Sequence, residues 1–230
     1  MKATPLAWPY IYAKGKLVRP HSQNDETAII KDLLSRFDVP RRFVEFGFSG
    51  WEFNCASLAH DWEGLLIDGD QYNVNIARTI FPNRVKSERI WLTLDNLGFI
   101  RDYIGNRELG ILSIDVDGND YWFLRELINS KPAILINEYN STLGLRPLTI
   151  PYDPNFNYRN FATWSYYGAS LAALAHIAEK HDYALMAVGS RGINAYFVRK
   201  DLLTSRDQPL DLETAYYPHT HGSGGSPAEQ

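Results

Sequence analysis

The sequence predicts an α/β fold in which helices cover both faces of a seven-stranded, mostly parallel sheet that ends in an antiparallel hairpin. Short apolar segments alternate with amphipathic segments between residues 42 and 138, as in the repeated βαβ units of a parallel sheet. The last two apolar segments, 183–188 and 193–198, are joined by Gly189-Ser-Arg-Gly192. So short a glycine-containing turn is typical of a hairpin.

The individual elements follow from the spacing of apolar residues. We expect strands at 42–47, 64–68, 88–93, 109–115, 133–138, 183–188 and 193–198. We expect helices at 25–37, 72–81, 95–104, 121–128 and 168–180, and one more with Trp51, Cys55, Leu58 and Ala59 on a single face. Residues 139–167 show no clear helical pattern, and so long a loop inside a compact domain is usually functional.

The length of 230 residues fits one domain, which we place at 1–217. It begins with an arm at 1–24 that carries aromatic residues and prolines, which leaves a homodimer open. The segment 218–230 is rich in glycine and serine with almost nothing to bury, so we expect a disordered tail.

Composition restricts the partners. The formal net charge is −4 and no basic run is present, so nothing favours a nucleic acid. The single cysteine, Cys55, excludes an intrachain disulfide and fits a reducing compartment. No apolar stretch approaches the roughly 18 residues of a membrane span, so we expect a cytoplasmic protein with no membrane partner.

Acidic residues lie at or just after the end of each of the first five expected strands. They are Glu45, Asp68 with Asp70, Asp95, Asp115 with Asp117, and Glu138. The carboxyl ends of parallel strands share one edge of the sheet, where carboxylates repel unless a cation or hydrogen-bond donors meet them. S-adenosylmethionine supplies positive charge, ribose hydroxyls and an adenine amine. Each acid taken alone is equally consistent with a turn residue or a helix cap.

The first turn reads Glu45-Phe-Gly47-Phe-Ser-Gly50, and its glycines let the backbone pass close to a ligand. It does not match the dinucleotide pattern G-x-G-x-x-G, and no Gly-Lys-Ser/Thr segment is present. Both observations weaken NAD and ATP as ligands. Asp68 follows the turn by about 20 residues, where a carboxylate can accept both ribose hydroxyls.

Several segments together resemble one family. They are Ser22–Glu26, Val44–Gly47, Leu66–Asp70, Leu112–Tyr121 and Ile136–Asn140. Over roughly residues 22–200 the sequence resembles the FkbM-type methyltransferases, which are class I S-adenosylmethionine-dependent enzymes with a Rossmann-like fold. The resemblance implies methyl transfer to a hydroxyl of a sugar, glycan or other small molecule. An NAD-dependent oxidoreductase and a non-catalytic binding module of the same fold stay open as alternatives.

The resemblance also implies roles for individual residues. Glu45 and Gly47 would line the methionine part of the cofactor, Asp68 would hold the ribose, and Asp95 would lie near the adenine amine. Gly50, Thr93 and Asp115 complete the expected cofactor set.

Asp115, Asp117 and Glu138 are the expected catalytic acids. Three carboxylates at the ends of adjacent strands can bind Mg²⁺ through oxygen ligands. Without a metal, Asp115 or Glu138 can act as the general base. His21 is a further catalytic candidate, because it precedes the Ser22–Glu26 segment and can fold over the pocket.

The loop after the fifth strand is the expected acceptor site, with seven aromatic residues between 152 and 167. Aromatic faces stack on sugar rings and also build small cores, and both interpretations stay open. Arg146 and Arg159 can hold a phosphate or carboxylate of an anionic acceptor. The expected acceptor set is Tyr139, Asn140, Arg146, Arg159 and Tyr167.

Overall fold

The computed structural model describes residues 21–163 and 165–218. Most of the expected arm and nearly all of the expected tail lie outside the described residues. Within the described part of the chain, no helix has the length and apolar character needed to cross a membrane.

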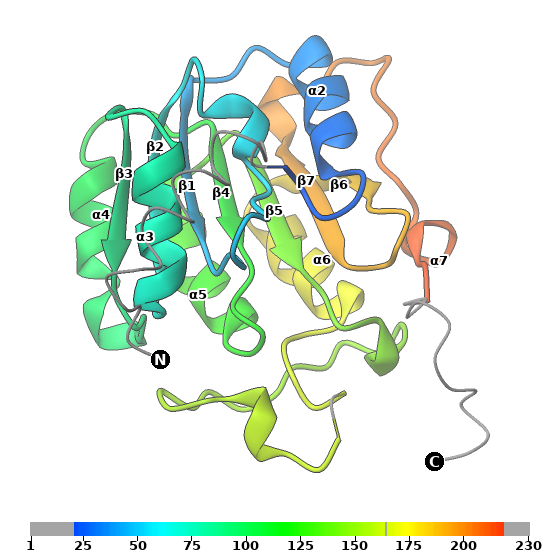
Figure 1. The fold of residues 1–230 in the computed structure, drawn as a ribbon. Coiled ribbons are helices and arrows are strands. Elements are labelled where there is room, and N and C mark those ends of the chain that lie inside the picture. Colours follow the sequence, from blue (N-terminus) through cyan, green and yellow to red (C-terminus); the bar gives the residue numbers. More distant parts are fainter. Residues whose placement is uncertain (1–20, 164, 219–230) are drawn as a thin grey trace.

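A seven-stranded sheet in the order β3-β2-β1-β4-β5-β7-β6 forms the centre of the molecule (Figure 1). The strands are β1 (Arg42–Phe46), β2 (Glu63–Asp68), β3 (Val85–Arg89), β4 (Ile111–Ile114), β5 (Ile134–Glu138), β6 (Tyr183–Val188) and β7 (Asn194–Arg199). The first five strands are parallel, and β7 runs antiparallel between β5 and β6. The predicted mostly parallel sheet with a C-terminal hairpin is therefore confirmed.

Helices and short 3-10 turns join the strands. The helices are α2 (Glu26–Arg36), α3 (Gln71–Ile80), α4 (Gly98–Ile104), α5 (Asp120–Leu127), α6 (Leu171–Lys180) and α7 (Leu212–Ala215). The 3-10 turns are η1 (Ala56–Leu58), η2 (Leu94–Asn96), η3 (Ile128–Ser130), η4 (Ser141–Leu143), η5 (Tyr158–Asn160) and η6 (Lys200–Leu202).

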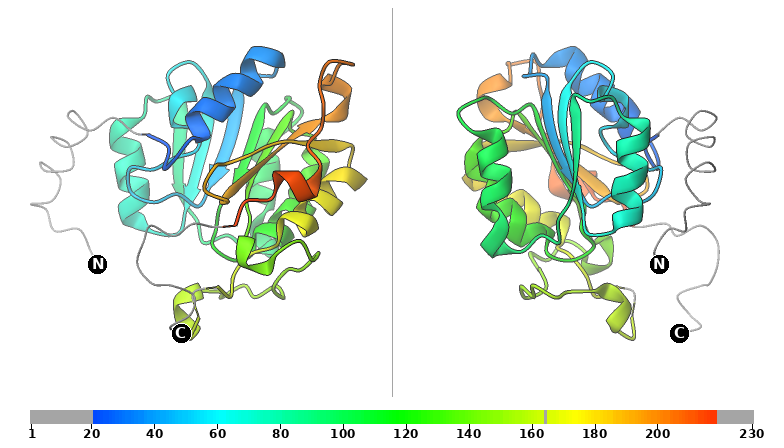
Figure 2. Two further views of the ribbon diagram at one scale, coloured as in Figure 1. Left: turned by 90° about the vertical axis from the view of Figure 1, so that its right-hand side faces the viewer. Right: turned by 60° about the vertical axis from the view of Figure 1, so that its left-hand side comes forward.

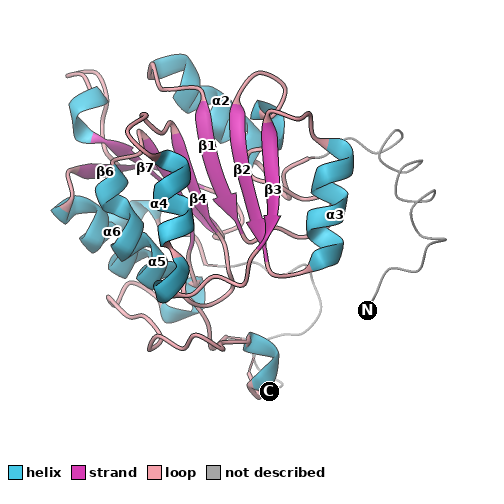
Figure 3. Cartoon of the chain, turned by 90° about the vertical axis from the view of Figure 1, so that its left-hand side faces the viewer, coloured by secondary structure: helices cyan, strands magenta, loops and turns pink. Residues whose placement is uncertain are grey.

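The helices form a layer on each face of the sheet, as predicted. Alternation along each strand sends successive side chains into two separate apolar clusters. One cluster holds side chains of α2 and α3, and the other holds those of α4, α5 and α6. The sheet lies between these layers in the right-hand view of Figure 2, and Figure 3 shows α4, α5 and α6 together on one face.

Two predicted elements were wrong. Strand β3 ends at Arg89, not at residue 93, because its last pairing partner is the last residue of β2, Asp68. The apolar segment Ile90–Leu92 lies beyond the strand. The predicted helix around Trp51–Ala59 is reduced to η1, because the amide groups of Asn54 and Cys55 donate to the Glu45 carboxylate instead of to helical carbonyls.

Gly47 marks the closest approach between the ends of β1 and β4. Its φ of 74° lies in the left-handed region, and a Cβ there would overlap the carbonyl oxygen of Asp115.

Gly47→Ala is therefore expected to lower the free energy of unfolding by at least about 3 kcal/mol, because strain and a backbone clash add. Urea denaturation followed by circular dichroism measures this.

Gly98→Ala is the matched control, because a Cβ at Gly98 meets no atom within 4 Å and the residue begins α4. This variant should be at least as stable as the wild type. Equal stability of the two variants would contradict the close-approach argument.

Candidate functional site

A cavity of about 290 Å³ opens at the carboxyl edge of the sheet. It is lined by Gly47 after β1, by the end of β2 and the start of α3, and by the segments that follow β3, β4 and β5. In Figure 1 the loop after β5 lies beyond the arrowheads of β4 and β5, at this same edge. In parallel α/β sheets this edge is where ligands bind.

Asp68 lies in the cavity wall at the end of β2. Its Oδ1 accepts hydrogen bonds from the amide of Asp70 at 2.6 Å and from Asn73 Nδ2 at 3.2 Å. Within the described part of the chain, its Oδ2 accepts only the amide of Phe48, at 3.4 Å. A carboxylate offers about four acceptor sites, so Oδ2 retains capacity for a ligand hydroxyl. Burial raises the pKa of Asp68, and these hydrogen bonds partly offset the effect.

An apolar wall faces Asp68 in the same cavity. Ile90, Trp91 and Leu92 come from the segment after β3, and Phe123 comes from α5. The Trp91 ring is 56% exposed and lies over Gly69, where a Cβ would come within 2.7 Å of it. A flat apolar wall beside a carboxylate that can accept diol hydroxyls fits a nucleoside.

The turn after β4 is fixed by a buried carboxylate. Asp120, at 0% exposure, accepts the amides of Val116 and Gly118, both at 2.8 Å. Burial raises the pKa of Asp120 to about 6, and the two amides limit the rise. The turn places Asp117 in the cavity wall with a φ of 56°, a left-handed conformation held by the surrounding structure.

Asp115, Asp117 and Glu138 form the acidic cluster. One carboxylate oxygen of each lies within 4.8 Å of the others, as the positions of β4 and β5 predict. Burial and the neighbouring acids raise the pKa of both Asp115 and Glu138 well above the ordinary range. Tyr167 faces this cluster: burial and the charges of Glu138 and Asp117 raise its pKa. The side-chain atom Oε2 of Glu138 is buried and has no hydrogen-bond partner among the described residues.

The loop after β5 covers the cavity and is held on both sides. On the β4 side, Asn119 donates to the carbonyl of Asp153 at 2.7 Å and accepts its amide at 3.3 Å. On the β3 side, Trp91 Nε1 donates to the carbonyl of Pro154 at 2.8 Å, and Tyr152 accepts the amide of Leu94 at 2.9 Å. The loop is therefore an anchored roof over the cavity.

Phe156 and Arg159 bring this roof into contact with the cavity. A Cβ at Gly118 would overlap the Phe156 ring, so the ring lies directly on the turn after β4. Among the described residues that line the cavity, Arg159 is the only Lys, Arg or His. The negative charge of Asp117 lies near it. Desolvation raises the pKa of Asp117, and the positive charge of Arg159 partly offsets that rise.

Other predicted cofactor residues lie outside the cavity lining. Thr93 and the exposed Asp95 belong to the start of η2, because β3 ends four residues earlier than predicted. Gly50 has a φ of 55° and donates its amide to Asn73 Oδ1 at 3.0 Å. Glu45 is 1% exposed, and its two oxygens accept the amides of Asn54 and Cys55, so it shapes the turn from beneath.

The predicted acceptor and catalytic residues separate into two groups. Arg159 lines the cavity and Tyr167 faces the acidic cluster. The others lie elsewhere: Tyr139 donates to the carbonyl of Tyr217 at 3.1 Å, and exposed Arg146 is not in the cavity wall. Asn140 is fully buried with its amide donating to the carbonyls of Ser165 and Tyr167.

His21 lies apart from the cavity, beside the turn after β1. The backbone amide of His21 donates to the carbonyl of Trp51 at 3.2 Å, and its carbonyl accepts the amide of Phe53 at 2.9 Å. The structure therefore gives no support to a catalytic His21.

Four residues that shape the cavity were not predicted: Asn73, Trp91, Asn119 and Asp120. The Asn119–Asp120 pair carried a sequence signal, because Asn and Asp at the start of a helix often hydrogen-bond to the backbone of the turn before it. Trp91 carried none, since its apolar segment is indistinguishable from a strand by periodicity.

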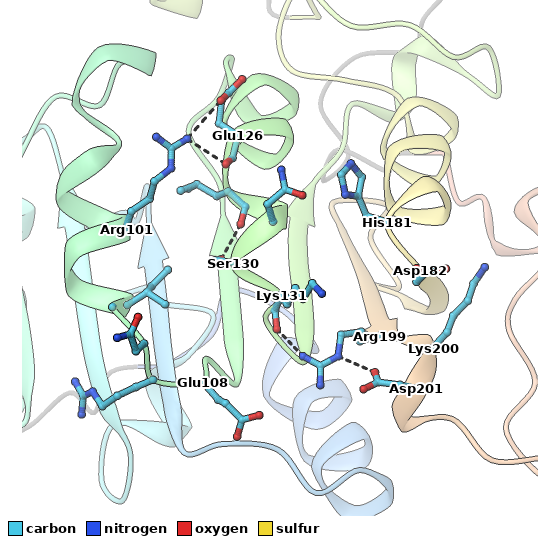
Figure 4. A pocket seen from close by; sticks show the side chains of 16 residues that line it. Arg101, Glu108, Glu126, Ser130, Lys131, His181, Asp182, Arg199, Lys200 and Asp201 are labelled. Carbon is cyan, nitrogen blue, oxygen red and sulfur yellow. Dashed lines mark hydrogen bonds and ion pairs between the residues drawn. The ribbon is translucent and has the colours of Figure 1, made fainter.

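A larger cavity of about 1080 Å³ lies elsewhere, between the C-terminal ends of α4, α5 and α6 (Figure 4). Its charged groups largely neutralise one another, as in the pairs Arg101–Glu126 and Arg199–Asp201. It contains none of the strand-end carboxylates. Size alone therefore does not identify the functional site.

No protein-family model matches the chain, and neither does any curated protein sequence. Solved structures do match. The O-methyltransferase from Bacillus cereus in complex with SAH is 15% identical, with 86% of this chain and 91% of that chain covered and a TM-score of 0.50. The N-terminal domain of EvdMO1, crystallised in the presence of SAH and D-fucose, is 12% identical, covering 84% and 96% with a TM-score of 0.49.

WbdD, crystallised with a kinase inhibitor, is 14% identical with a TM-score of 0.45. The match covers 81% of this chain but 42% of that chain, so this chain spans less than half of the length of WbdD. From the Bacillus cereus match and the strand order, the chain has the Rossmann-like fold of SAM-dependent methyltransferases.

The raised pKa of Glu45 predicts how the free energy of unfolding changes with pH. Burial raises its pKa from 4.5 to about 7, and the amides of Cys55 and Asn54 limit the rise. Between these values the folded state binds more protons than the unfolded state, so the contribution of Glu45 to stability falls as pH rises. Across this window wild type should lose up to about 3 kcal/mol relative to Glu45→Gln. Urea unfolding at pH 4.5 to 8 measures it, and parallel pH profiles would contradict the assignment.

Proposed function

We propose that this chain is an S-adenosylmethionine-dependent methyltransferase that methylates a hydroxyl of a sugar, glycan or other small molecule. The observation that carries the proposal is that one cavity brings together Asp68, the apolar wall at Trp91 and Asp117, the member of the acidic cluster that lines it. The fold supports the same function. The narrower FkbM-type assignment stays a prediction from the sequence resemblance.

The cavity fits the nucleoside half of the cofactor. Asp68 Oδ2 has free acceptor capacity for a ribose hydroxyl, and Ile90, Trp91 and Leu92 supply an apolar wall for a base. Gly47 brings backbone to the cavity without a side chain in the way. When bound, the cofactor supplies an electrophilic methyl group on a sulfonium.

The connection between β1 and β2 argues against a dinucleotide. Pyrophosphates bind at the N-terminus of the helix that follows the first strand. Here the described residues between β1 and β2 contain only the three-residue turn η1. Without a helical N-terminus at Gly47, the oxidoreductase alternative lacks its phosphate site.

The acidic cluster can orient the acceptor and take its proton. Burial and the neighbouring acids raise the pKa of both Asp115 and Glu138, which makes their carboxyl groups better proton acceptors than exposed acids. Either carboxylate can take the proton of an acceptor hydroxyl. The roof at Phe156 and Arg159 covers the cavity and brings the positive charge of Arg159 near Asp117.

The same cluster fits a divalent cation. Asp115, Asp117 and Glu138 would hold Mg²⁺ through carboxylate oxygens, and the unpartnered Oε2 of Glu138 is available for it. A metal there would lower the pKa of the acceptor hydroxyl. If a metal is required, EDTA should abolish turnover. If a carboxylate acts as the base without a metal, activity should resist EDTA and fall at acid pH.

Asp68→Asn is expected to weaken SAH binding by at least about tenfold, because charge-assisted hydrogen bonds to the ribose are lost. Isothermal titration calorimetry measures the affinity. Asp95→Asn is the control: Asp95 is exposed and does not line the cavity, so its affinity should equal that of the wild type. If Asp95→Asn weakened SAH binding as much as Asp68→Asn, the assignment of Asp68 to the ribose would be contradicted.

Glu138→Gln is expected to lower kcat by at least about a hundredfold while SAH affinity changes little, because an acceptor contact is lost and the cofactor contacts remain. The assay uses radiolabelled methyl transfer to a panel of sugars. Turnover at the wild-type rate in this variant would show that Glu138 has no role in catalysis.

A further inference from the structure

A second polar cluster lies on the α2 face of the sheet, separate from the cavity. We call it the α2 chamber and define it by Glu26 of α2, Glu45 of β1, Asn54, and Asn194 and Tyr196 of β7. All five are buried, from 0% exposure for Tyr196 to 8% for Asn54. The chamber therefore holds polar groups where water does not reach them freely.

Direct contacts join these residues. Asn194 Nδ2 lies 3.4 Å from Glu26 Oε1 and 3.5 Å from Asn54 Oδ1. Asn54 donates its amide to Glu45 at 2.7 Å. Tyr196 pairs with Ile136, in the row of the sheet that contains Ser113 and Glu45. Four separate segments thus bring their polar side chains to one place.

The chamber contains negative charge without a matching cation. Within the described ranges, no Arg or Lys forms an ion pair with Glu26 or Glu45, although both carboxyl groups are 1% exposed. An uncompensated buried carboxylate is strongly unfavourable, so such groups pair, bind a cation or protonate.

Two fully buried polar atoms in the chamber also lack a partner in the described part of the chain. They are the hydroxyl of Tyr196 and Oδ1 of Asn194. Asn194 and Tyr196 are two residues apart on β7, so their side chains lie on the same face of the sheet. Buried polar atoms are nearly always satisfied, so both point to a ligand that they share.

We propose that the α2 chamber binds a monovalent metal cation, Na⁺ or K⁺, through oxygen donors that include Glu26, Tyr196 and Asn194. The available donors are a carboxylate, a hydroxyl and an amide oxygen, which are hard ligands suited to such ions. Most carboxylate oxygens here already accept amide hydrogen bonds, so a single positive charge balances the chamber. The cation joins α2 to β7 and stabilises the fold.

The test compares thermal unfolding of the full chain in KCl, NaCl and choline chloride at equal ionic strength. At about ten times the Kd, the favoured ion should raise Tm by about 3 to 6 °C over choline. Tyr196→Phe should abolish this ion-specific rise. Tyr183→Phe is the matched control, because that buried hydroxyl donates to the carbonyl of Pro132 outside the chamber, and it should keep the rise.

Identical melting of the wild type in all three salts would overturn the proposal and leave water as the occupant. A crystal soaked in RbCl gives an independent answer that requires no variant to fold. An anomalous peak beside the Tyr196 hydroxyl supports the cation. If KCl is the salt that raises Tm, a chamber without a Rb⁺ peak contradicts the proposal.

Discussion

The candidate site depends on one buried interaction, the capture of two backbone amides by the carboxylate of Asp120. By accepting from Val116 and Gly118, Asp120 forces the chain after β4 into a tight turn. That turn directs Asp117 to the cavity in a left-handed conformation and presents Asn119 to the loop after β5. The position of Asp117 in the cavity wall and the Asn119 anchor of the roof therefore both depend on a single carboxylate.

The same device recurs after β1. Glu45 accepts the amides of Asn54 and Cys55, and the helix expected there gives way to an irregular turn over the strand end. Because the described turn contains only the three-residue η1, the carboxyl edge of β1 lacks the helix N-terminus that a pyrophosphate binds. Buried acids thus serve two purposes here: some fix backbone, and others face the cavity.

Much of the fold was predictable, since alternating apolar segments have a clear period and the hairpin has a glycine turn. The β3 boundary was not, because Ile90–Leu92 continues the apolar run while the pairing with β2 ends at Asp68. Of the site, the acids at the ends of β4 and β5 were predictable from strand order alone. The anchoring role of Asn140 and the cavity role of Trp91 depend on contacts between distant segments, 25 residues apart for Asn140–Ser165 and 63 for Trp91–Pro154.

The central claim is that the edge cavity accepts a nucleoside bearing a sulfonium or thioether chain. Isothermal titration calorimetry of the wild-type protein with SAH, and separately with NAD⁺, tests it most directly. The account predicts a saturable one-to-one isotherm with SAH and no measurable heat with NAD⁺. Saturable binding of NAD⁺ with none of SAH would contradict it.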